Sequence, residues 1–95
     1  MERVLLKVNG APDVAFVGED VARVYDSFAD VLTTIYETEK GNWFLAVTNN
    51  ESVLVRQKVI ENKSAEDLKN VLGYSDLAKS LYEQLGIDTT NNLDI

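Results

Sequence analysis

GEDVARVYDSFADVLTTIYETEK, residues 18–40, is the stretch from which we predict the fold. At about 100° per residue its apolar side chains fall on one broad arc of a helical wheel, as in an amphipathic helix. The arc consists of Val21, Val24, Tyr25, Phe28, Val31, Leu32 and Ile35. Opposite it lies an acidic stripe of Glu19, Asp26, Asp30 and Glu37, interrupted only by Arg23. We therefore predict a helix from Glu19 to Glu39 with a buried apolar face and an acidic outward face.

The sequence on both sides of this stretch predicts β-strands. Alternating apolar and polar residues indicate strands at 3–8 and 43–48, a short strand at 13–17 and the longest at 53–60. The first two strands in the chain are separated by Asn9-Gly10-Ala11-Pro12, and the last two by Asn49-Asn50-Glu51-Ser52. Both connections are rich in turn-forming residues. We therefore expect hairpins, with 43–48 and 53–60 forming one of them.

Two short helices are expected after the strands. Ser64 can cap the first helix, with Asp67 in the reciprocal position, and Gly73 ends it. Ser75 can cap a second helix over residues 76–85, which stops at Gly86. The expected fold is therefore α+β in the order ββαββα(α), an antiparallel four-stranded sheet with helices packed on one face. Residues 1–87 form a single compact domain in this prediction, and residues 88–95 a flexible polar C-terminal tail.

The composition predicts a soluble, cytoplasmic protein whose acidity either keeps it in solution or favours encounter with basic surfaces. Among 95 residues, 16 are acidic and nine are basic, which gives a net charge of −7. This balance repels nucleic acid and anionic membranes and favours encounter with basic partners. No apolar run approaches the ~20 residues that span a bilayer, and Met1-Glu2-Arg3 does not begin a signal peptide.

The residues that most often carry enzyme chemistry are missing. The chain has no histidine and no cysteine, and no glycine-rich phosphate loop. Ser75 and Lys79 are one helical turn apart, but a capping serine is the better interpretation. Asp26 and Asp30 could share a divalent ion, although two carboxylates alone make a weak site. We expect a protein without enzyme activity, cofactor or metal site.

The acidic stripe suggests a function. On a helix with a rise of ~1.5 Å per residue, the gaps between its four carboxylates are roughly 10, 6 and 10 Å. The middle gap is close to the ~6–7 Å between neighbouring phosphates that the charge spacing of nucleic acid suggests. By analogy with small acidic inhibitors of nucleases, restriction enzymes and CRISPR effectors, including phage anti-defence proteins, we expect a DNA-mimic-like inhibitor or regulator. Its partner would be a basic protein, such as a nuclease or a nucleic-acid-binding complex. The alternative is an ordinary solvated helix face.

Direct nucleic-acid binding is a second hypothesis. Arg3, Lys7, Arg56 and Lys58 all fall on outward strand positions, and they would form an exposed basic face if the helices covered the other side of the sheet. No aromatic side chain clearly joins them, so the stacking platform of an RNA-binding sheet is weak.

Residues 64–87 resemble a helix-turn-helix unit in the placing of Leu68, Leu72-Gly73, Ser75 and Leu85-Gly86-Ile87. The start of its second helix offers Lys79 against Asp76 and Glu83, a poor set for reading the major groove. Helices used for packing are therefore the better interpretation, and direct nucleic-acid binding is not expected. A third hypothesis is a self-associating accessory subunit, for example a homodimer formed through a free strand edge or through outward apolar residues such as Leu5, Leu54 and Ile60.

Overall fold

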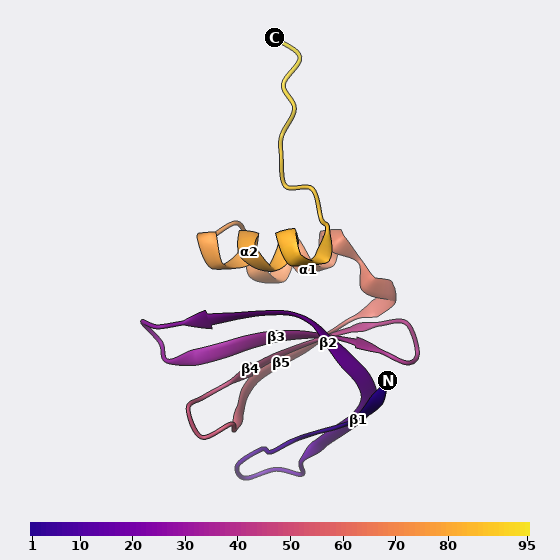
Figure 1. Cartoon of the computed structure of the whole chain (residues 1–95), viewed down its shortest axis with the longest axis vertical. Coiled ribbons are helices and arrows are strands. Elements are labelled where there is room, and N and C mark those ends of the chain that lie inside the picture. Colours follow the sequence, from indigo (N-terminus) through magenta and orange to yellow (C-terminus); the bar gives the residue numbers. More distant parts are fainter.

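The computed structural model describes all 95 residues and shows an α+β fold (Figure 1). Five strands form one antiparallel sheet in the order β1-β2-β3-β4-β5, and a short 3₁₀ turn and two helices follow. The elements are β1 (Glu2–Leu6), β2 (Val14–Asp26), β3 (Val31–Thr38), β4 (Trp43–Thr48), β5 (Leu54–Ile60), η1 (Glu61–Lys63), α1 (Ala65–Leu72) and α2 (Asp76–Leu85). The predicted α+β class is confirmed, but the sheet has five strands instead of four and the element order differs.

The predicted helix over residues 19–39 is wrong. This stretch is the second half of β2, a turn and β3, paired as an antiparallel hairpin from Gly18↔Thr38 to Asp26↔Val31. Many of its residues are β-branched, including Thr33, Thr34 and Ile35, and such residues favour a pleated sheet.

A β-bulge explains why the stretch looked helical. The register between β2 and β3 shifts between Asp20 and Ala22, so that Val21 is an extra residue. A bulge interrupts the period-2 alternation of a strand. β3 is also a central strand with cover on both faces, so Thr34 and Ile35 are both buried although they are neighbours. Together these features place apolar residues three and four positions apart in the sequence, which is the spacing typical of an amphipathic helix.

The other predicted elements are close to those observed. The strand expected at 13–17 exists but continues to Asp26, and 43–48 pairs with 54–60 as a hairpin. Ser64 caps α1 by accepting a hydrogen bond from the Asp67 amide, and Ser75 caps α2 by accepting one from the Ala78 amide. Gly73 and Gly86 end the two helices. No helix or strand follows Gly86.

β2 changes partner in its middle, at Gly18. Residues 14–18 pair with β1 and residues 18–26 pair with β3, so Gly18 stands opposite both Glu2 and Thr38. A Cβ atom at Gly18 would lie 2.6 Å from the backbone oxygen of Glu37 and 3.2 Å from the ring of Phe16. Glycine is therefore required here by close approach, as is common at strand bends.

The sheet separates two apolar clusters. The helix side holds Ala22, Ile35, Trp43, Leu45, Ile60, Leu68, Ala78, Leu81 and Tyr82. The other side holds Leu6, Phe44, Ala46 and Leu54, flanked by Val4, Val14, Phe16 and Tyr36. This second cluster is covered because the β1–β2 hairpin curls beneath the sheet, as Figure 1 shows below β3, β4 and β5. The curl brings Lys7 beside Val53, where the Leu54 amide donates to the Lys7 carbonyl at 2.8 Å.

α2 is fixed to the part of β2 that has no strand partner on its β1 side. Beyond Gly18, β1 no longer covers the outer edge of β2. There the side chain of Gln84 accepts from the Arg23 amide at 3.0 Å and donates to the Arg23 carbonyl at 2.9 Å. Within the helix pair, the buried Tyr82 hydroxyl donates to the Gly73 carbonyl at 2.6 Å. The position of the helices is thus set by polar contacts as well as by the apolar cluster.

We predict that Gly18→Ala lowers the free energy of unfolding by about 1–3 kcal/mol, because the new methyl group must displace the Glu37 carbonyl or the Phe16 ring. Urea unfolding followed by Trp43 fluorescence measures this change. Ala15→Gly is a comparison at an exposed position of the same strand, where no close contact is altered. A Gly18→Ala variant as stable as the wild type would contradict the role given to Gly18.

Candidate protein-interaction site

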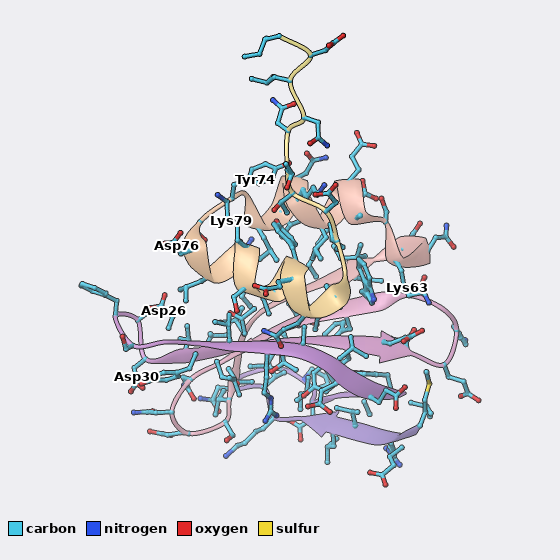
Figure 2. All side chains as sticks on the ribbon, turned by 45° about the horizontal axis from the view of Figure 1, so that its top comes forward. Asp26, Asp30, Lys63, Tyr74, Asp76 and Lys79 are labelled. Atoms are coloured by element: carbon cyan, nitrogen blue, oxygen red, sulfur yellow. The ribbon has the colours of Figure 1, made fainter.

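The four residues of the predicted acidic stripe do not form one row. Asp26 and Asp30 lie at the two ends of the β2–β3 turn, whereas Glu19 and Glu37 are cross-strand partners toward the other end of the hairpin. Seven residues of strand separate Glu19 from Asp26, which corresponds to roughly 20 Å. In Figure 2, Asp26 and Asp30 lie on one side of the molecule and Lys63, the partner of Glu37, on the other. The carboxylate spacing predicted for a helix is therefore absent from the structure.

The Glu19–Glu37 end is partly neutralised. Lys63 Nζ lies 2.8 Å from Glu37 Oε1, in an ion pair between η1 and β3. This cation offsets the repulsion between two glutamates on directly opposite strand positions. On the same strand, Arg23 Nη2 lies 3.5 Å from Asp20 Oδ2.

The Asp26–Asp30 end is an ordered turn. Asp26 Oδ1 accepts from the Phe28 amide at 2.9 Å and from the Ala29 amide at 3.2 Å, which closes the turn by a side chain. Asp30 has a positive φ of 53°, a conformation that aspartate and asparagine tolerate better than most residues. The Tyr25 hydroxyl donates to Asp30 Oδ1 across the hairpin. The Asp26 carboxylate therefore holds the backbone of the turn, and the Asp30 carboxylate joins the turn to the Tyr25 side chain.

Phe28 stands at the tip of this turn and is 102% exposed. It touches no apolar cluster, and neighbouring Tyr25 is also exposed. The two ion pairs of the chain involve neither Asp26 nor Asp30, so their charges are uncompensated. We call Tyr25, Asp26, Phe28 and Asp30 the acidic tip. Protein interfaces use such anchors: an exposed aromatic side chain on a fixed turn, here between two carboxylates that no cation neutralises.

The sequence placed Phe28 in the core, and this prediction is wrong. The helical wheel assigned it to the apolar arc, because nothing in Ser27-Phe28-Ala29 is a strong turn former. The signal that could have identified the turn is Asp26, since aspartate two residues before a free amide commonly closes a turn.

The carboxylates of the acidic tip also shift the pKa of Tyr25. The hydrogen bond to Asp30 raises the pKa of Tyr25 above its ordinary value, and the negative charges of Asp30 and Asp26 act in the same direction. Loss of the phenolic proton would break this hydrogen bond and place two negative charges side by side.

A further exposed carboxylate, Asp76 at the start of α2, is on the same side of the molecule as Asp26 and Asp30 in Figure 2. The neighbouring Ser75 hydroxyl oxygen is engaged in capping by the Ala78 amide at 3.2 Å, as expected for a cap.

The basic residues singled out from the sequence do not form the expected face opposite the helices. Arg3, Lys7, Arg56 and Lys58 are all exposed. However, Lys58 pairs with Leu45, which belongs to the helix-side cluster, so Lys58 and Arg56, two residues away, lie on the side of the sheet that the helices cover. Lys58 also shares a hollow with Glu61 and Asp67.

The helix-turn-helix-like segment is used for packing. Ala78, Leu81 and Tyr82 of α2 are buried against the sheet, and its exposed side carries Asp76, Lys79 and Glu83. Leu54 and Ile60, expected to point outward, are buried, whereas Leu5 is exposed.

No group of three or more carboxylates is arranged to hold a metal ion. None of the helices is long and apolar enough to cross a membrane. Comparison with protein-family models, with curated proteins and with solved structures gives no match for this chain.

We predict that Asp30→Asn lowers the pKa of Tyr25 toward its ordinary value, since the amide keeps an acceptor oxygen and removes the charge. In the wild type the raised pKa of Tyr25 means that the hydrogen bond from its hydroxyl to Asp30 stabilises the turn below about pH 10. This stabilisation is lost as the pH rises through the pKa of Tyr25 in the folded state. Ultraviolet titration of the tyrosinate, with Tyr25→Phe to assign the signal, measures the change. An identical Tyr25 titration in Asp30→Asn would contradict the contact.

Proposed function

We propose that this chain is a non-enzymatic acidic binding protein that docks onto a basic protein partner through the acidic tip. The observation that carries the proposal is the full exposure of Phe28 on a turn that Asp26 holds by two hydrogen bonds. A partner of matching chemistry has an apolar pocket for Phe28 with lysine or arginine side chains at its rim.

The ordered turn favours binding through this tip. A side chain displayed on a fixed backbone loses little conformational freedom when it binds, which leaves more of the contact energy for affinity. The net charge of −7 acts over a longer range, because it draws the protein toward basic surfaces.

The partner class we favour is a nucleic-acid-processing protein, such as a nuclease or a nucleic-acid-binding complex, which the chain would inhibit or regulate. Proteins of this class carry the basic surfaces that the tip requires. Docking in this way needs no row of carboxylates spaced like phosphates, and the hairpin of β2 and β3 does not form one. Occupation of a basic pocket by Phe28, Asp26 and Asp30 is sufficient to block it.

Substitutions at the tip separate this function from folding. We expect Phe28→Ser to abolish partner binding and to change the free energy of unfolding by no more than about 0.5 kcal/mol, since the ring is fully exposed. Asp26→Asn with Asp30→Asn keeps the acceptor oxygens of the turn and removes both charges. We expect it to weaken binding at least about tenfold, the range observed for charges at interfaces.

The measurement is an affinity capture from the source cell or its host with wild-type and variant baits, followed by titration of the retained protein. The matched control is Glu19→Gln with Glu37→Gln, which removes the same charge at the other end of the hairpin. A partner retained equally by all four baits would refute docking through the tip. A low-salt gel shift tests the competing function, because tight binding of DNA by the chain itself would favour a nucleic-acid binder.

A further inference from the structure

β5 is an exposed edge strand with no partner along most of its length. Its only contact on the outer side is at its start, where Lys7 bridges Val53 and accepts from the Leu54 amide. Residues 55–59 are all exposed, including Val55 at 56% and Val59 at 52%. An uncovered strand of this length, with apolar side chains, is a template for the addition of another strand.

An apolar groove of about 530 Å³ lies beside this edge. Its lining includes Phe16 of β2, Phe44 of β4, and Gln57 and Val59 of β5. The Phe16 and Phe44 rings are 5.0 Å apart between centroids. Pairing on the β3 side of β2 begins where the Glu39 amide donates to the Val17 carbonyl at 2.9 Å, so residues 14–16, on the far wall of the groove, are also uncovered on that side. The groove can therefore receive an extended segment with apolar side chains at alternate positions.

The chain itself contains such a segment. Residues 91–95, Asn-Asn-Leu-Asp-Ile, form no helix or strand, and Leu93 and Ile95 are 67% and 108% exposed. In an extended conformation Leu93 and Ile95 project to one side and Asp94 to the other. We propose that residues 91–95 of a second copy of this chain add to β5 as a sixth strand, with Leu93 and Ile95 in the groove.

The charges on β5 agree with this placement. Gln57 and Val59 pair with Ala46 and Phe44 on the groove side, so Arg56 and Lys58 lie on the opposite side of the strand. When Leu93 and Ile95 enter the groove, Asp94 is on that opposite side as well. Opposite charges on neighbouring strands stabilise the pairing.

The structure favours a second copy over the chain's own segment. Lys69 Nζ donates to the Asp88 carbonyl at 3.0 Å, and the Thr90 amide donates to Asp88 Oδ1 at 2.9 Å. These contacts fix the start of the segment on the helix layer, and from there it extends away from the sheet (Figure 1). If each copy donates its segment to the other, the two contacts are related by a twofold axis and the buried area doubles.

Sedimentation equilibrium of the full chain over a range of concentrations tests the proposal. We expect a monomer–dimer equilibrium whose dissociation constant rises at least about tenfold in the double variant Leu93→Ser with Ile95→Ser, since it removes the two apolar side chains that the dimer would bury. Asn92→Ser, on the side away from the groove, is the control and leaves the constant unchanged.

Exchanging the charges of Asp94 and of Arg56 and Lys58 tests whether residues 91–95 lie beside β5. Asp94→Lys weakens the dimer, as does Arg56→Glu with Lys58→Glu, and the three changes combined in one chain restore it. None of these residues belongs to the acidic tip, so the result is independent of partner binding through Phe28.

Three results would overturn the proposal. The first is a chain that stays monomeric at all concentrations. The second is a dimer that the Leu93 and Ile95 substitutions leave unchanged. The third is a monomer in which those amides of residues 55–59 that point away from β4 are protected from hydrogen exchange at every concentration, which would show that the chain's own segment covers β5.

Discussion

The fold depends on the change of partner at Gly18. A single long strand serves two ladders, and the point where they overlap has no room for a side chain between the Glu37 carbonyl and the Phe16 ring. The close approach lets the first part of β2 turn beneath the sheet with β1. This movement encloses the second apolar cluster and brings Lys7 to Val53. One sheet can therefore cover both of its faces, one with helices and one with its own hairpin.

The same change of partner leaves strand edges that need other contacts. On the β1 side, the second half of β2 receives the Gln84 side chain, which satisfies the Arg23 amide and carbonyl and attaches α2. On the β3 side, residues 14–17 border the groove next to β5. The edge that Gln84 satisfies fixes the helix layer, and residues 14–17 form one wall of the groove proposed to receive the apolar side chains of a strand added to β5. Both follow from the difference in length between β1 and β2.

The acidic tip combines two roles in the same carboxylates. Asp26 closes the turn and Asp30 adopts a positive φ while accepting from Tyr25, yet neither is paired with a cation. Local backbone chemistry alone explains why these residues are aspartates. It does not explain a fully exposed phenylalanine between them, since Phe28 contributes nothing to the packing of the chain. This residue is the reason for placing the interaction site at this end of the molecule.

Elements with local sequence signals could be predicted without the structure. The capping serines at 64 and 75, the glycines that end both helices, and the hairpin of 43–48 with 54–60 depend on nearest neighbours, and all were predicted. The sequence also identified Asp26 and Asp30 as candidate contact residues, although for a helical reason that was wrong.

Only the tertiary structure decided the conformation of residues 19–39. A bulge at Val21 and a central strand buried on both faces remove the alternation by which a strand is recognised, and both arise from pairing between distant residues. The separation of Glu19 and Glu37 from the tip, the exposure of Phe28 and the uncovered edge of β5 follow from that pairing. These features are set by which strands pair, and the alternation of residues along one strand does not specify which distant strand lies beside it.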